Sequence, residues 1–185
     1  MNKYRFIKLK KASYYIILLL SLLLWSCSTK KNTRMNRFYH ALNSRFNIYY
    51  NGKTAFDEAL SAMQNGYKEN YADMILMYPI SAQPKDKSET GGAFDRAIEK
   101  SNKAIKLHSI QAKPVKKAGW RNNPKMVKWQ NQEEYNPFLK KCWMLMGEAQ
   151  FYNADFLQAS ATFSYICRHY KEDEEIVAMA KLWQA

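Results

Sequence analysis

Apolar residues recur at helical spacing along most of the chain. The first series predicts a helix over Asn36–Asn51. Its apolar members are Phe38, Leu42, Phe46, Tyr49 and Tyr50. Gly52 stands where a glycine commonly ends a helix. Thr54 and Asp57 have the spacing of a capping box, which predicts that a second helix begins at Thr54 and ends near Gly66.

The middle of the chain alternates between helical and irregular patterns. A short helix is expected over Asn70–Met77, a polar loop over Ala82–Gly92, and a longer helix from Ala93 to about His108. Residues 109–137 hold three prolines and one glycine among many basic residues, and their apolar residues show no regular spacing. They are interpreted as a long loop with one short helix around Met126–Gln132, and loops of this length are often functional.

Residues 138–185 carry the most specific pattern. Trp143 and Gly147 lie in one predicted helix, and Ala159 and Phe163 lie in the next, across a turn at residues 153–155. The spacing resembles a tetratricopeptide repeat, in which we expect Gly147 to face Ala159 at a close helix contact while the two aromatic residues fill the flanking space. A plain antiparallel helical hairpin explains the same residues. The fold class predicted is all-α, with helical hairpins of tetratricopeptide-repeat (α-solenoid) type.

The N-terminus has the pattern of a targeting segment. A basic stretch over residues 1–11 precedes an apolar run, Tyr14–Trp25, which is too short to span a bilayer as a helix. The run ends in Leu-Leu-Trp-Ser before Cys27, and the chain then turns polar. This resembles a bacterial lipoprotein signal, which implies cleavage before Cys27 and acylation of that residue. The alternative is a signal-anchor helix with an incidental cysteine.

These patterns divide the chain into five parts. They are a signal peptide (1–26), a lipidated basic tether (27–35), an N-terminal helical region with a degenerate repeat (36–108), a basic loop (109–137), and tetratricopeptide-like helices (138–185). The last helix, Ile176–Ala185, reaches the end of the sequence without a stop signal. Because solenoids need about three repeats, we expect the sequence to be the N-terminal part of a longer chain.

Composition and charge refine this picture. Apolar residues make up 47% of the chain, which excludes a disordered protein, and only three cysteines are present, too few for a disulfide framework. The net charge of +13 is concentrated in two segments besides the signal: residues 27–56 have six bases and no acid, and residues 103–141 have ten bases and two acids. Either segment could contact anionic lipid or an acidic partner, or simply stay solvated. The candidate interaction loop comprises Lys116, Lys117, Trp120, Arg121 and Trp129.

A search for catalytic chemistry finds little. The sequence Gly52-Lys53-Thr54 lacks the upstream glycine of a phosphate-binding loop, and His40, His108 and His169 lack the spacing of metal ligands.

Other reactive side chains have structural interpretations. Cys142 and Cys167 are interpreted as core residues, although they could approach one another, and the acids Glu133-Glu134 and Glu172–Glu175 as solvated helix ends. We therefore expect no enzyme, no metal, no cofactor, no small-molecule substrate and no nucleic acid.

Several longer phrases resemble one family, the PorW/SprE lipoproteins of Bacteroidetes, which contain tetratricopeptide repeats and belong to type IX protein secretion and gliding motility. These phrases begin at Cys27 (CSTKKN), Arg37 (RFYHAL), Phe46 (FNIYYNGK), Arg96 (RAIEK), Lys106 (KLHSI), Glu134 (EYNPF) and Gly147 (GEAQFY). The resemblance implies an outer-membrane lipoprotein, anchored at Cys27 and facing the periplasm. It also implies a non-catalytic helical scaffold whose partners are other proteins of the secretion machinery.

Two other classes stay open. One is a generic periplasmic tetratricopeptide lipoprotein for outer-membrane assembly. The other is a glycan-binding lipoprotein that uses Trp120, Trp129 and Tyr135 as sugar platforms.

Overall fold

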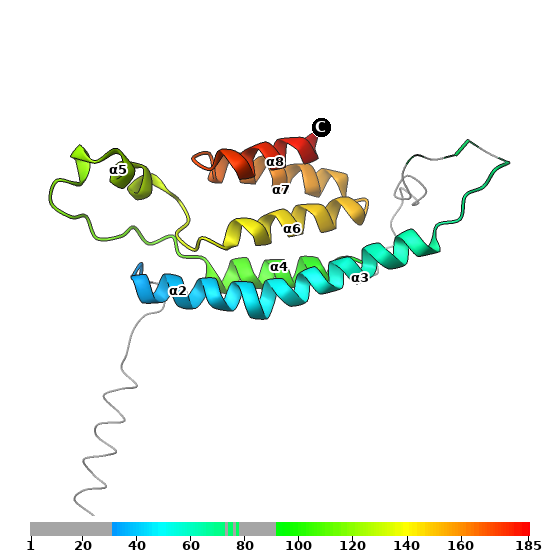
Figure 1. The fold of residues 1–185 in the computed structure, drawn as a ribbon, viewed down its shortest axis with the longest axis horizontal. Helices are drawn as coiled ribbons and strands as arrows, with labels where there is room; N and C mark the ends of the chain where they lie inside the picture. Colours follow the sequence, from blue (N-terminus) through cyan, green and yellow to red (C-terminus); the bar gives the residue numbers. More distant parts are fainter. Residues whose placement is uncertain (1–30, 73, 76, 78–91) are drawn as a thin grey trace, which may run out of the picture. The chain divides into compact units, whose positions relative to one another are not determined.

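A computed structural model describes residues 31–72, 74, 75, 77 and 92–185 (Figure 1). Cys27 and the predicted signal peptide lie outside the described residues. Asn32–Ala185 form a compact unit of their own. Every regular element in the described ranges is a helix, so the predicted all-α class is confirmed. Within those ranges, no helix combines the length and the apolar character that crossing a membrane requires.

The first long helix is continuous where the sequence predicted a break. α2 (Arg34–Asn43), the π-helical η1 (Ser44–Tyr49) and α3 (Tyr50–Gly66) follow one another without interruption. Gly52 is buried inside this helix, and a Cβ there would lie 3.1 Å from the Cβ of Lys100. The helix end predicted at Gly52 is therefore wrong: this glycine permits the close approach of a neighbouring helix.

The predicted capping box is wrong for a related reason. Thr54 lies within α3, and its hydroxyl donates a hydrogen bond to the Tyr50 carbonyl (3.0 Å). Asp57 instead accepts from Lys53 one turn earlier (2.5 Å). The helix begins much earlier, where the Thr33 hydroxyl accepts from the backbone N–H of Asn36 (3.2 Å). Thr33 was not predicted from the sequence to cap a helix.

The helix predicted over Asn70–Met77 is also wrong for the residues described there, which have turn and irregular backbone. The Asn70 side chain accepts the backbone N–H of Ala72 (3.1 Å), an Asx turn that competes with helix formation. Most of the loop predicted over Ala82–Gly92 lies outside the described residues.

The next two predicted helices are present. α4 (Asp95–His108) matches the helix expected from Ala93 to His108. After a short 3-10 turn, η3 (Trp120–Asn122), comes α5 (Pro124–Asn131), the short helix expected within the basic loop. The Asn123 side chain caps α5 by accepting from the N–H of Lys125 (3.0 Å), and Pro124 occupies the first turn, where its missing donor is harmless.

The C-terminal part is a series of three helices: α6 (Leu139–Tyr152), α7 (Phe156–His169) and α8 (Glu174–Gln184). Each helix packs on the next, so that α3, α4, α6, α7 and α8 lie side by side in chain order (Figure 1). The turn between α6 and α7 falls at residues 153–155, as predicted, with Ala154 at a positive φ of 61°.

α6 is covered on two sides by separate apolar clusters. One side packs with α3 and α4 around Phe56, Phe94 and Leu145. The other packs with α7 and α8, where Met144 meets Phe163. A central helix buried on both sides fixes the spacing of the helices before and after it.

Candidate interaction groove

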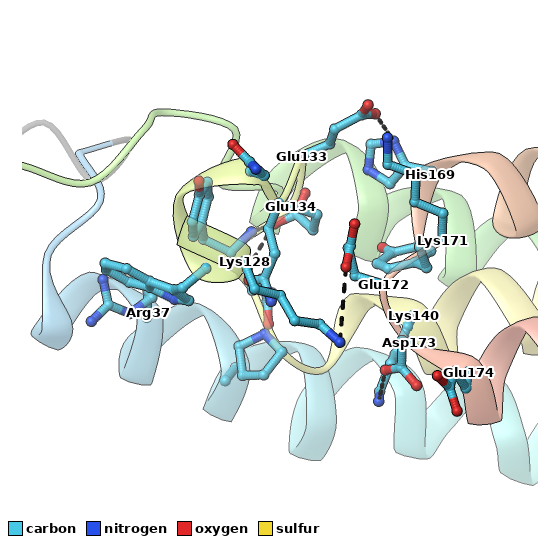
Figure 2. A pocket seen from close by; sticks show the side chains of 18 of the residues that line it. Arg37, Lys128, Glu133, Glu134, Lys140, His169, Lys171, Glu172, Asp173 and Glu174 are labelled. Carbon is cyan, nitrogen blue, oxygen red and sulfur yellow. Dashed lines mark hydrogen bonds and ion pairs between the residues drawn. The ribbon is translucent and has the colours of Figure 1, made fainter. Parts of the chain in front are cut away.

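An open groove of about 800 Å³ lies where three segments of the chain meet (Figure 2). They are residues 37–41 of α2, residues 128–140 between the end of α5 and the start of α6, and residues 169–174 between α7 and α8. Most of the middle segment, up to residue 137, belongs to the basic loop predicted from the sequence, but its position depends on buried polar contacts that the sequence did not reveal.

Glu134 holds the base of the groove together. It is buried, and one carboxylate oxygen accepts the backbone N–H groups of Ile110 (2.8 Å), Tyr135 (3.0 Å) and Asn136 (2.8 Å). The other oxygen accepts the Ser109 hydroxyl (2.5 Å). The prediction that Glu134 is a solvated helix end is therefore wrong: it joins the beginning of the basic loop to its end.

Asn136 extends this network to the neighbouring helices. Its side-chain amide donates to the Ser44 hydroxyl (3.0 Å) and to the His108 carbonyl (2.9 Å), and its side-chain oxygen accepts the Phe138 N–H (3.1 Å). One buried side chain thereby connects η1, the end of α4 and the start of α6. The sequence signal was an asparagine before Pro137, which indicated only a helix start.

Two histidines that are 68 residues apart lie in contact beside this network. The Nδ1 atoms of His40 and His108 are 2.8 Å apart, so one ring donates and the other accepts. Burial lowers the pKa of His108, and the neighbouring His40 lowers it further. Spacing along the sequence could not reveal this pair. Among the described residues, no group of three or more histidine, cysteine, aspartate or glutamate side chains could hold a metal ion.

Two lysine–carboxylate ion pairs and one histidine–carboxylate contact connect residues 128–140 to residues 169–174 across the groove (Figure 2). Lys128 lies 3.8 Å from Glu172, Lys140 lies 2.5 Å from Asp173, and the ring of His169 lies 2.8 Å from Glu133.

Asp173 has a second role in this arrangement, because its carboxylate also caps α8. Burial acts to raise the pKa of Asp173, but hydrogen bonds from Lys140 and from the Ile176 N–H hold it below its usual value. Within Glu172–Glu175, which was predicted to be a solvated helix end, Asp173 is thus a helix cap that also forms an ion pair with Lys140.

The remaining lining is aromatic and cationic. Trp129 is half-buried, with its ring edge-to-face on Tyr135 and the Arg37 guanidinium 5.2 Å from its centre. The Tyr170 hydroxyl is buried without a hydrogen-bond partner among the described residues, and burial strongly raises its pKa. Tryptophan, tyrosine and arginine are the side chains that dominate binding energy at protein interfaces. The groove therefore suits a polypeptide partner.

The predicted interaction loop divides between two places. Trp129 lines the groove, whereas Trp120 and Lys116 line a smaller neighbouring one of about 450 Å³. Lys117 and Arg121 are exposed outside both, and the Arg121 guanidinium lies 5.4 Å from the Trp120 ring. The two grooves share Asn131, Lys171 and Glu172, so they form one continuous region.

The aromatic platform expected for glycan binding is incomplete. Tyr135 is only 3% exposed, and its hydroxyl donates to the Gln130 carbonyl (3.1 Å). A buried ring cannot stack on a sugar. Only Trp120 and Trp129 of the expected three aromatic residues are accessible, and they face different grooves.

The predicted packing residues lie on α6 and α7. Gly147 is buried. A Cβ on it would lie 2.6 Å from the ring of Phe163, and the three atoms nearest to this Cβ all belong to Phe163 and not to Ala159. The close helix contact was expected correctly, but its partner was misassigned. Ala159 is buried in the same cluster as Phe163, and Trp143 packs against Tyr165 with ring centres 4.4 Å apart.

Cys142 and Cys167 are both free, and Cys142 is fully buried. Burial raises the pKa of Cys142 to about 12, which disfavours the reactive thiolate. The interpretation of Cys142 as a core residue agrees with its position.

The sequence matches no protein-family model and no curated protein. Geometry and side-chain chemistry therefore carry the functional argument.

Proposed function

We propose that this chain is an outer-membrane lipoprotein that acts as a helical protein–protein interaction scaffold in the type IX secretion and gliding-motility machinery. In this proposal the acylated Cys27 holds the protein at the periplasmic face of the outer membrane. The helices present surfaces to other secretion proteins, and the chain performs no catalysis. The family resemblance of the sequence motivates the choice of machinery.

The observation that carries the scaffold proposal is the groove between α2, residues 128–140 and residues 169–174. Its charged side chains are largely paired with one another, as Lys140 is with Asp173. Arg37 and Trp129 form a half-buried cation–aromatic pair that lines it. Such a surface offers aromatic and hydrogen-bonding contacts to a partner and needs no reactive group.

The α6–α8 series supports a tetratricopeptide-type architecture. A glycine on α6 accommodates an aromatic ring from α7, and α8 then packs on both helices. In repeat proteins each hairpin buries its apolar face against the next, and the cluster around Met144, Phe163 and Ile176 provides such a face. We propose that α6 and α7 form one repeat and that α8 begins the next.

The groove is tested by replacing its cation–aromatic pair. Arg37→Ala with Trp129→Ala should lower recovery of secretion proteins at least about tenfold in affinity capture from a Bacteroidetes host, because truncating an interface hot spot costs about 2 kcal/mol or more. Arg168→Ala with Leu157→Ala, two exposed positions outside the groove, serves as the matched control. Equal recovery by both variants, with unchanged melting temperatures, would contradict the proposal. Recovery of outer-membrane assembly factors instead would favour the generic lipoprotein.

The exposed part of the basic loop is tested by charge reversal. Lys116→Glu, Lys117→Glu and Arg121→Glu together should weaken the same capture while leaving the free energy of unfolding within about 0.5 kcal/mol, since these side chains are exposed. Reversal of three exposed lysines elsewhere changes the net charge equally; these are Lys103, Lys106 and Lys181. If both triple variants lose partners equally, net charge and not the loop is responsible.

The anchor is tested separately. Cys27→Ser should release the protein from the outer-membrane fraction and remove the acyl mass from its N-terminus, while its circular dichroism stays helical. A Cys27→Ser protein that carries the same lipid mass would refute the anchor.

A further inference from the structure

The solvent face of the first helix is unusually apolar. Six large apolar or aromatic side chains form one exposed stripe along α2, η1 and the first residue of α3, hereafter the outward stripe: Met35, Phe38, Tyr39, Leu42, Phe46 and Tyr50. Their exposed fractions range from 44% for Leu42 to 74% for Met35. Scattered exposed apolar residues are normal, but a contiguous series on one helix indicates a surface that something covers.

The opposite face of the same helix is the one that packs inward, and it is small and mostly polar. His40, Ser44, Ile48 and Gly52 are buried at intervals of four residues. His40 contacts His108, and Ser44 accepts from Asn136, so polar contacts position the helix. The larger apolar side chains are thus left on the solvent side, opposite to the usual arrangement of a surface helix.

The π-helical turn keeps the outward stripe straight. A π-helix has more residues per turn than an α-helix, so a step of four residues stays closer to one side of the axis. Leu42, Phe46 and Tyr50 are separated by such steps across η1. The same geometry aligns the buried residues on the other side.

Charge distinguishes between the surfaces that could cover this stripe. Arg34 and Arg45 are exposed beside Met35 and Phe46, and the Arg45 guanidinium lies 5.0 Å from the Phe46 ring. No acidic residue occurs between residues 27 and 56. An apolar helix face with arginines and without carboxylates matches a bilayer surface that contains anionic phospholipid.

We propose that the outward stripe lies on such a membrane surface, with its apolar side chains at the boundary between headgroups and acyl chains and with Arg34 and Arg45 at lipid phosphates. The proposal rests on the proposed anchor for its membrane. The seven residues from Cys27 to Arg34 reach at most about 25 Å when extended, so an acylated Cys27 would keep this helix near the bilayer. The helix then acts as a second membrane contact that orients the groove.

The test uses the mature chain from residue 27 with Cys27→Ser, which carries no acyl chain and retains the compact unit Asn32–Ala185. Sedimentation with vesicles of phosphatidylethanolamine containing one quarter phosphatidylglycerol should show binding that high salt weakens. Vesicles of phosphatidylcholine alone should bind less. Substituting Met35→Ser, Leu42→Ser and Phe46→Ser together should lower the partition coefficient more than about tenfold, because three apolar side chains are lost from the contact. Phe38 is retained because it also lines the groove.

The matched control replaces three comparably exposed leucines outside the stripe with serine: Leu107, Leu157 and Leu182. The control should bind like the parent, and both triple variants should keep its melting temperature. Absence of vesicle binding by the parent, or equal binding by the stripe variant, would overturn the proposal. A concentration-dependent dimer that the stripe variant abolishes, without vesicle binding, would instead assign the stripe to a second copy of the chain.

The anchor and the stripe can fail independently. If mass spectrometry finds Cys27 acylated but the unacylated chain ignores vesicles, only the stripe proposal fails. If Cys27 carries no lipid but the stripe binds vesicles, the anchor fails and the stripe stands.

Discussion

The α6–α8 series and the α2–η1 helix pack by opposite means. In the first, large apolar side chains such as Met144, Phe163 and Ile166 point into a shared cluster. In the second, the inward face carries His40 and Ser44, and the large apolar side chains face outward. One region is held by a large apolar cluster, whereas the other combines hydrogen bonds to buried polar partners with a small apolar cluster around Ile48.

The difference shows how periodicity can mislead. A series of apolar residues at helical spacing predicts a helix correctly in both regions, but it identifies the buried face only in α6–α8. In α2–η1 the buried face is set by partners that are distant in sequence, such as His108 and Asn136. Buried polar networks are costly to break, because each lost partner leaves a group that water cannot reach.

Among the alanine substitutions, the largest expected effect comes from breaking that network at Asn136. Asn136→Ala removes three hydrogen bonds, to Ser44, His108 and Phe138. At about 1 kcal/mol each, the free energy of unfolding should fall by about 3 kcal/mol. Urea unfolding followed by circular dichroism measures this change. Asn102→Ala, at an exposed position on α4, should change stability little. A similar loss of stability in both variants would contradict a stabilising role of the hydrogen bonds of Asn136.

The apolar region is tested by a smaller change. Gly147→Ala places a methyl group 2.6 Å from the Phe163 ring, which is only 1% exposed and has little room to move. Overpacking of this kind should cost about 1–3 kcal/mol. Gly147→Leu should cost more.

Gly66→Ala is the matched control for this substitution. It also adds a methyl group to a glycine of a long helix, but nothing lies within 4 Å of the new Cβ. Because alanine favours helix over glycine by up to about 1 kcal/mol, this variant should be neutral or more stable. If Gly147→Ala were equally benign, α6 and α7 would not approach as closely as Phe163 indicates.

The smallest effect concerns pH. The pKa of His108 is lowered by burial and by His40, so the unfolded chain binds this proton at a higher pH than the folded protein does. The free energy of unfolding should therefore decrease as the pH falls below about 6.5. His108→Gln should remove this component, so that its melting temperature changes less than that of the parent between pH 7.5 and pH 5.5. Burial raises the pKa of Glu148, but that opposing contribution is common to both proteins. If the melting temperatures of His108→Gln and the parent changed equally with pH, this role of His108 would be contradicted.

Local sequence accounts for much of the helical part and little of the groove. α4, α6 and α7 were predicted because their apolar spacing and their turns are local signals. Gly52 was predicted to end a helix because glycine commonly does so. The structure gives another reason for this glycine: Lys100 of the neighbouring helix lies so close that a Cβ would be crowded. Glu134 looked solvated because its donors include Ser109 and Ile110, more than twenty residues away.

The sequence by itself determined the all-α class, the order of most helices and the abundance of basic residues, since these follow from period, capping residues and composition. Only the tertiary structure decided which face of α2–η1 is buried, that His40 meets His108, and that Trp129 and Trp120 face two adjoining grooves. The physical reason is that helix formation depends on residues three and four apart. Burial of a polar side chain depends instead on whether a distant segment supplies its hydrogen bonds, and only the folded chain brings Asn136 to Ser44.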